Sequence, residues 1–339
     1  MKARSDGTLV HLPGFVIGIA ISGACLWFAF SRVNWPDLRV ALDHVGHLWL
    51  GGALGVHLAR ILTLVWRWRV LLSSQGERRW KIALGSLAVG YAANTILPFR
   101  SGDLARIGGV SRLTGIPAGR VSAALLMERL GDALALVLLA AISLFFLPEG
   151  FWRLWRGPSP ADSQLRITAA LMAVILGCMV MVWKWILPRF SPRLAGRLTR
   201  FLAELRAGFV TSLAGRRQPA WIGLSLLTWL LEVVTYLFVL RAIGLPLMFW
   251  DSLVLCALGS LVVLIPGAPG GFGTFELAIQ TLLGLYGYDP SQGLVASLLI
   301  HTMVLLPITL IGSVYMLKYT HAFRAVARRG TGLERNGPA

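Results

Sequence analysis

The feature that most restricts the fold of this chain is the recurrence of apolar stretches long enough to cross a lipid bilayer. A helix of about 20 apolar residues spans the hydrocarbon layer. Hydrophobic residues make up 56% of the sequence and charged residues only 14%, which lies outside the composition of soluble domains. The chain is therefore expected to be an all-α, polytopic integral membrane protein. Full spans are predicted at about 13–30, 48–66, 121–147, 166–187, 219–241 and 291–317.

Two further apolar stretches are interrupted by proline and glycine. Residues 82–98 run into the sequence PFRSGD before the apolar pattern resumes at Leu104, and 252–266 run into PGAPGGFG before it resumes at 274–286. Proline removes a backbone donor and glycine tolerates open conformations, so both sites end a helix. Irregular backbone at membrane depth is tolerated only where protein or water satisfies it. We therefore predict two helical hairpins, with re-entrant and fully crossing hairpins left as alternatives.

Basic residues are unevenly distributed along the chain and predict its orientation. The net charge is +17, and Lys and Arg gather in the predicted loops 67–81 and 188–218 and in the tail 321–339. This pattern is typical of cytoplasmic loops that contact anionic headgroups, and it does not indicate nucleic-acid binding. We expect no nucleic-acid partner, a membrane domain at 13–320 after a short N-terminus at 1–12, both termini in the cytoplasm, and a cell (inner or cytoplasmic) membrane location.

An internal similarity suggests two repeats. Residues 117–128 (PAGRVSAALLME) resemble 290–301 (PSQGLVASLLIH), and each stretch follows a hairpin and opens a span. The order span, span, hairpin, span then occurs twice, at about 13–147 and 166–318. Three crossings per unit would invert the second copy, an architecture found in transporters. Chance similarity between Ala- and Leu-rich helices is the alternative, and the link to transport is an analogy.

One predicted span contains three charged residues, Glu128, Arg129 and Asp132. An unpaired charge at a helix centre costs about 2.5–3.5 kcal/mol on insertion scales, so we expect the three to be paired. Arg129 and Asp132 are three residues apart and can pair along the helix, whereas Glu128 and Asp132 would repel each other. Glu128 therefore needs a cation from elsewhere, with Arg106 or Arg60 as candidates. A structural ion pair at the membrane boundary is the alternative to a binding site.

Other candidates lie near the breaks and in the spans. Glu276 follows the second break, where the helix dipole favours a carboxylate, so capping alone is an alternative explanation. Arg60 can snorkel to the interface, and a lone histidine such as His301 is typically a hydrogen-bonded packing residue. Arginines after the first break can hold an anionic headgroup or belong to an ordinary loop. The remaining candidates are Arg100 and Asp103 after the first break and Glu232 in the span 219–241.

Signatures of an enzyme or a cofactor site are absent from the sequence. His44 and His47 have metal-like spacing with Asp43 but no further ligands nearby, and we find no P-loop, nucleotide fingerprint or nucleophile motif. The three cysteines occur singly in apolar stretches, without metal or disulfide spacing. We therefore expect no catalytic residues, no metal and no cofactor.

Three ordered motifs carry a resemblance to a known family. They are 94–106 (NTILPFRSGDLAR), 128–132 (ERLGD) and 266–276 (PGAPGGFGTFE). Over roughly 13–320 the chain resembles the lysylphosphatidylglycerol synthase transmembrane-domain, or flippase-like, family. The resemblance implies eight transmembrane segments and a role in moving a lipid across the bilayer. Best-known members are fused to a soluble aminoacyltransferase that this sequence lacks, so we do not expect lipid aminoacylation.

The resemblance adds weight to some candidates and leaves several functions open. It favours Arg106, Glu128, Arg129 and Glu276 as site residues, and Arg60 and Glu232 less so. The leading hypothesis is a lipid flippase or lipid-handling transporter for a lipid with a polar or anionic headgroup. The alternatives are an accessory subunit for a membrane synthase or glycosyltransferase partner, and an intramembrane lipid-modifying enzyme.

Overall fold

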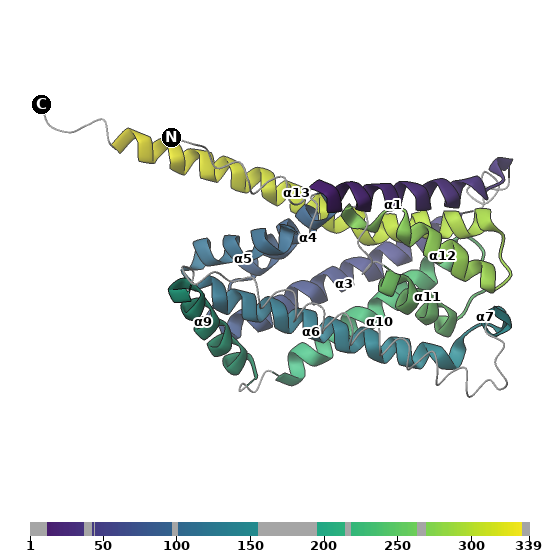
Figure 1. Ribbon diagram of the computed structural model, residues 1–339, viewed down its shortest axis with the longest axis horizontal. Helices are drawn as coiled ribbons and strands as arrows, with labels where there is room; N and C mark the ends of the chain where they lie inside the picture. Colours follow the sequence, from purple (N-terminus) through teal and green to yellow (C-terminus); the bar gives the residue numbers. More distant parts are fainter. Residues whose placement is uncertain are drawn as a thin grey trace, which may run out of the picture.

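A computed structural model describes residues 12–36, 43, 45–96, 101–154, 195–213, 218–262 and 269–333. All regular structure in these residues is helical (Figure 1). In chain order the helices are α1 (Leu12–Ser31), α3 (His47–Ser74), α4 (Trp80–Ile96), α5 (Ser101–Thr114), α6 (Ala118–Ser143), α7 (Glu149–Leu154), α9 (Ala195–Leu213), α10 (Gln218–Ala242), α11 (Phe249–Val262), α12 (Thr274–Leu285) and α13 (Pro290–Leu333), with short 3-10 turns η2 (Leu144–Phe146) and η5 (Pro269–Gly271).

Four helices are long and apolar enough to cross a membrane. They run over His47–Ser74, Ala118–Phe146, Pro219–Ala242 and Pro290–Lys318, and each coincides with a predicted span. The predicted span 13–30 coincides with α1, and the span 166–187 lies outside the described residues. The prediction of a polytopic helical membrane protein is therefore confirmed.

Two basic segments that were predicted to be loops are largely helical. The loop 67–81 was placed too early, because α3 continues to Ser74 through the apolar residues that follow Arg67. The segment 188–218 contains α9, which packs against α6 so closely that a Cβ on Gly208 would lie 2.6 Å from the Cβ of Ala123. Both errors arose because arginines were counted as loop residues, whereas α9 carries them along an amphipathic helix and α3 buries Arg67 inside the bundle.

The two interrupted stretches form helical hairpins. α4 packs against α5, and α11 packs against α12, so each pair folds back on itself (Figure 1). The four helices have 17, 14, 14 and 12 residues, which at 1.5 Å per residue is shorter than the hydrocarbon layer. The predicted hairpins are confirmed, whereas their inverted-repeat relation and the side of the membrane on which the termini lie stay predictions.

Glycine permits the close approach of α4 and α5. The backbone N–H of Gly102 donates to Oδ1 of Asn94 at 2.9 Å. A Cβ at Gly102 would overlap the carbonyl oxygen of Gly90 and would lie 2.8 Å from the backbone nitrogen of Asn94. The first hairpin therefore closes at a point where only glycine fits, directly beside Asp103.

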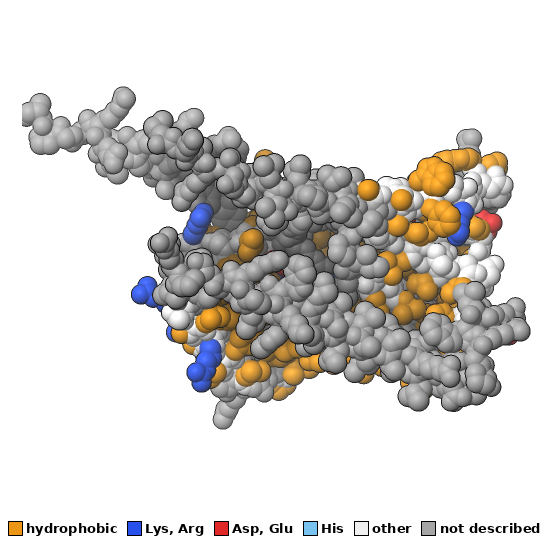
Figure 2. Space-filling view, viewed as in Figure 1, with side chains coloured by type: hydrophobic (Ala, Val, Ile, Leu, Met, Phe, Trp, Pro, Cys, Tyr) orange, Lys and Arg blue, Asp and Glu red, His pale blue; other side chains and the backbone are white. Residues whose placement is uncertain are grey.

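The face of α6 that points away from the bundle is apolar. Leu126, Leu130, Leu134 and Leu138 recur every four residues and are 46%, 45%, 58% and 47% exposed. Such a stripe suits contact with acyl chains. Figure 2 shows hydrophobic side chains along the flank of the molecule and most of the coloured Lys and Arg side chains at the end that contains α5 and α9. The opposite face of α6 points into the bundle and carries the charged residues of the site.

Candidate functional site

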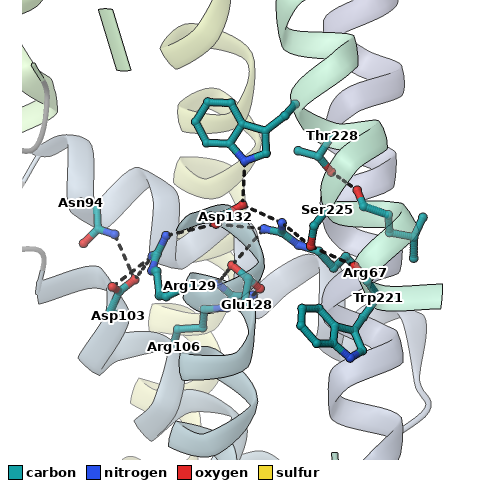
Figure 3. A network of polar contacts seen from close by, with 12 residues as sticks. Arg67, Asn94, Asp103, Arg106, Glu128, Arg129, Asp132, Trp221, Ser225 and Thr228 are labelled. Carbon is teal, nitrogen blue, oxygen red and sulfur yellow. Dashed lines mark hydrogen bonds and ion pairs between the residues drawn. The ribbon is translucent and has the colours of Figure 1, made fainter. Parts of the chain in front are cut away.

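Six ionisable side chains from α3, α5 and α6 form a continuous network inside the bundle (Figure 3). Three are arginines and three are carboxylates, so their formal charges cancel. They are Arg67, Asp103, Arg106, Glu128, Arg129 and Asp132. Buried ions are tolerated when every charge has a partner, and this network meets that condition.

One end of the network is closed to solvent. Arg106 donates to both oxygens of Glu128 at 2.9 and 2.6 Å, and their side chains are 1% and 0% exposed. The Arg106 guanidinium lies 3.6 Å from the ring centroid of Trp68, a cation–π contact that holds its plane. This pairing was one of two predicted for Glu128, and it is confirmed.

Arg67 joins the closed end to the rest of the network. Its Nη1 lies 2.6 Å from Oδ1 of Asp132, and its Nη2 lies 3.7 Å from Oε1 of Glu128. Glu128 and Asp132, four residues apart on α6, were expected to repel each other. The guanidinium of Arg67 lies between them and removes that repulsion. Trp229 also donates its Nε1–H to Asp132 at 3.2 Å.

The other end of the network is partly open. Nη2 of Arg129 lies 2.8 and 3.0 Å from the two oxygens of Asp103, and Asn94 donates to Oδ1 of Asp103 at 3.2 Å. The side chains of Arg129, Asp103 and Asp132 are 34%, 23% and 21% exposed. A molecule that enters the bundle would therefore reach these three residues before it reached the closed end.

Some of the predicted pairings are different in the structure. Arg129 contacts the predicted partner Asp132 only at 3.9 Å, because Asp103 on α5 offers a shorter contact. Arg60 was the alternative partner of Glu128, but its Nε lies 2.8 Å from Oε2 of Glu232. His57 is 3.8 Å from the same oxygen. Arg60 and Glu232 therefore form a second, partly buried pair, between α3 and α10.

Arg67 was predicted to lie in a cytoplasmic loop and was not among the predicted site residues. The side chain is fully buried. A signal was present in the sequence, because Arg67 follows Arg60 by seven residues and so lies on the same face of a helix, with Leu64 and Leu71 on that face as well. Arg100, another predicted site residue, lies outside the described residues.

The second break carries a separate buried pair, Glu276 and His301. Nδ1 of His301 lies 2.5 Å from Oε1 of Glu276, and Nε2 lies 2.9 Å from the carbonyl oxygen of Gly270. Oε2 of Glu276 accepts from the backbone N–H of Gly273 at 2.6 Å, so the predicted capping role is confirmed. The carboxylate nevertheless has a second partner that capping does not explain.

Within the described ranges, no three His, Cys, Asp or Glu side chains gather as a metal site. Outside the spanning helices, Arg79 holds the pKa of the Glu77 carboxyl below its usual range through a side-chain hydrogen bond of 2.7 Å. This pair of a buried carboxylate and an exposed arginine lies in the turn between α3 and α4.

Spanning helices that enclose a paired charge network define a multi-pass helical membrane protein. More narrowly, the chain belongs to the family described as the lysylphosphatidylglycerol synthase TM region, which matches residues 15–312. The resemblance predicted from the three motifs is confirmed. The chain is also similar to Glycosyltransferase AglD of Haloferax volcanii, with 27% identity over 289 residues, 73% of this chain and 45% of the relative. The chain thus spans less than half of that relative's length.

Proposed function

We propose that this protein moves a lipid with a polar, phosphate-bearing headgroup between the leaflets of a cytoplasmic membrane, without itself catalysing a chemical reaction. The observation that carries the proposal is the graded exposure of the charge network. Arg106 and Glu128 are sealed, whereas Arg129 and Asp103 at the other end are 34% and 23% exposed. Ionised side chains in a membrane bundle are expensive, and they are typically found where a polar substrate passes.

The open pair has the chemistry to receive a headgroup. A phosphate oxygen can replace Asp103 on the guanidinium of Arg129, since arginine binds phosphate and carboxylate with the same fork. Asp103 would keep its hydrogen bond from Asn94. Two further hydrogen-bond donors of the network could bind a headgroup, because Nε of Arg67 and Nε of Arg106 have no acceptor among the described residues.

The surroundings of the pair suit a lipid better than a water-soluble solute. Leu104, which follows Asp103 on α5, is 72% exposed, and Leu130, which follows Arg129 on α6, is 45% exposed. Apolar side chains therefore flank the charged pair on both helices. A lipid can place its headgroup on the pair while its acyl chains remain along these leucines. Family membership supports a lipid in this position.

Replacing Arg129 by alanine is expected to slow lipid movement about tenfold or more, because a hydrogen bond to a charged group contributes about 1.5–3 kcal/mol. The measurement is the transfer of a fluorophore-labelled phospholipid between leaflets of vesicles that contain the purified protein. Arg129→Lys should recover only part of the rate, since lysine lacks the bidentate fork. Arg112→Ala, in the exposed last turn of the neighbouring helix α5, should match the wild type. Equal rates for Arg129→Ala and the wild type would contradict the site.

A second candidate function follows from the relative that is named a glycosyltransferase. This chain matches 45% of the length of that relative. The chain would then present a lipid to a membrane glycosyltransferase or synthase instead of moving it alone. In that case the purified protein would retain a lipid and co-purify with such an enzyme, but vesicles containing it would show no transfer. Lipid transfer by the isolated protein would rule out this alternative.

A further inference from the structure

The pair at the second break holds its histidine between two oxygen atoms. On one side Nε2 of His301 faces the carbonyl oxygen of Gly270, and on the other Nδ1 faces Oε1 of Glu276. The second oxygen of Glu276 is occupied by the N–H of Gly273. Both backbone groups belong to the glycine-rich break, where Gly270 and Gly273 have φ values of 74° and 90°. The pair therefore fixes the break at two points.

The hydrogen bonds determine how many protons the pair holds. A carbonyl oxygen can only accept, so Nε2 of His301 carries a hydrogen. The contact of 2.5 Å between Nδ1 and Oε1 also requires a proton between the two atoms, because otherwise two lone pairs would face each other. The pair is thus neutral as a unit, either as imidazolium with carboxylate or as imidazole with carboxylic acid. It holds one proton more than a neutral histidine beside an ionised glutamate.

Loss of that proton would break one of the two contacts. If the remaining hydrogen stays on Nε2, the lone pair of Nδ1 faces the carboxylate of Glu276. If it moves to Nδ1, the lone pair of Nε2 faces the carbonyl of Gly270. In either tautomer the deprotonated pair loses one of the contacts that connect Gly270 to Gly273 through His301 and Glu276, and it also leaves a net negative charge in a buried position.

The side chains in direct contact with the pair offer no other site for its proton. Glu276 is fully buried and the side chain of His301 is 7% exposed, with the rings of Phe272 and Phe275 centred 4.6 and 4.7 Å from the imidazole. Among the described residues, neither forms an ion pair with any other side chain. Phe272 is 44% exposed, which places the pair one aromatic ring from the surface. The helices packed against α12 and α13 carry further ionisable groups, which are Cys25 on α1, His47, His57, Arg60, Arg67 and Arg69 on α3, Lys81 and Tyr91 on α4, Glu149 and Arg153 on α7, Glu232, Tyr236 and Arg241 on α10, and Asp251 and Cys256 on α11.

We propose that Glu276 and His301 form a proton-binding site that couples protonation to the conformation of the second break. The protonated pair connects Gly270 to Gly273, and the deprotonated pair loses that connection. The role of this site rests on the proposed function, because the site would couple lipid movement to the binding and release of a proton. The site itself can be tested without any lipid.

The variant Glu276→Gln removes the releasable proton of the pair but keeps its hydrogen bonds. The glutamine oxygen can accept from Gly273, and its amide NH₂ can donate to Nδ1 of a neutral His301 whose Nε2–H still bonds Gly270. All three contacts survive, so the variant is expected to fold, but the pair no longer has a proton to release. Glu77→Gln, a carboxyl-to-amide change in the α3–α4 turn, is the matched control.

The test is hydrogen–deuterium exchange of residues 269–276 in the full-length protein in detergent, from about pH 5 to pH 8, the range in which histidine ordinarily titrates. With rising pH, protection in the wild type and in Glu77→Gln should fall about tenfold or more relative to Glu276→Gln, because a hydrogen bond to a charged group is lost. Identical pH dependence in wild type and Glu276→Gln would overturn the proton site. Nitrogen NMR of labelled histidine gives a second readout, in which the Nδ1 signal of His301 should change with pH in the wild type but not in Glu276→Gln.

Lipid transfer in vesicles then tests the coupling. The wild-type rate should depend on pH and the Glu276→Gln rate should not; equal pH dependence would overturn the coupling. A wild type that moves no lipid at any pH would contradict the proposed function, whereas the exchange experiment would still decide whether the proton site exists.

Discussion

Replacing Glu128 by alanine is expected to destabilise the protein by about 3–5 kcal/mol, the effect of removing one partner from a buried ion pair. The change leaves Arg106, only 1% exposed, without a carboxylate, and it also removes the 3.7 Å partner of Arg67. The measurement is the free energy of unfolding in mixed micelles titrated with denaturing detergent.

Two further variants test whether the loss of stability in Glu128→Ala comes from the unpaired charge of Arg106 or from lost packing. Leu130→Ala lies on the same helix but on its lipid-facing side, 45% exposed, and should cost about 1 kcal/mol or less. The double variant Arg106→Met/Glu128→Met replaces both charges by flexible apolar side chains, and it should recover most of the lost stability. A double variant as unstable as Glu128→Ala would mean that packing, and not the unpaired charge, dominates at this position.

Gly102→Ala is expected to cost about 2–4 kcal/mol, although it adds a single methyl group. That methyl would overlap the carbonyl oxygen of Gly90 and crowd the backbone of Asn94, so α4 and α5 must separate. Overpacking typically costs about 1–3 kcal/mol, and the part-buried hydrogen bond from Gly102 to Asn94 would be lost in addition. The same unfolding measurement in micelles checks this value.

The same helix offers a matched control for this substitution. Gly108→Ala and Gly109→Ala would place a methyl group where no atom lies within 4 Å. Since alanine favours a helix over glycine by about 0.5–1 kcal/mol, both should stabilise the protein slightly. If Gly102→Ala behaved like these two variants, the close approach of α4 and α5 at Gly90 would be refuted.

The sequence predicted those features that depend on membrane energetics. Four spans and both hairpins followed from apolar length and from proline and glycine, and the Arg106–Glu128 pair followed from the cost of an unpaired charge in a span. Arg67 and α9 were missed because a local count of basic residues cannot separate a loop from the charged face of a helix. The contact between Glu276 and His301 depends on how α12 packs against α13, and the repeat alignment had matched His301 with Glu128 without suggesting a partner for it.

The neutrality of the charge network has a consequence for how the protein is made. Arg67 and Arg106 lie on helices that are synthesised before α6, which supplies Glu128 and Asp132. While the chain emerges from the ribosome, these two arginines have no carboxylate of the network except Asp103. The early helices therefore have to remain near the insertion machinery, or keep their arginines at the aqueous boundary, until α6 arrives. Biogenesis of this bundle depends on the joint capture of α3, α5 and α6.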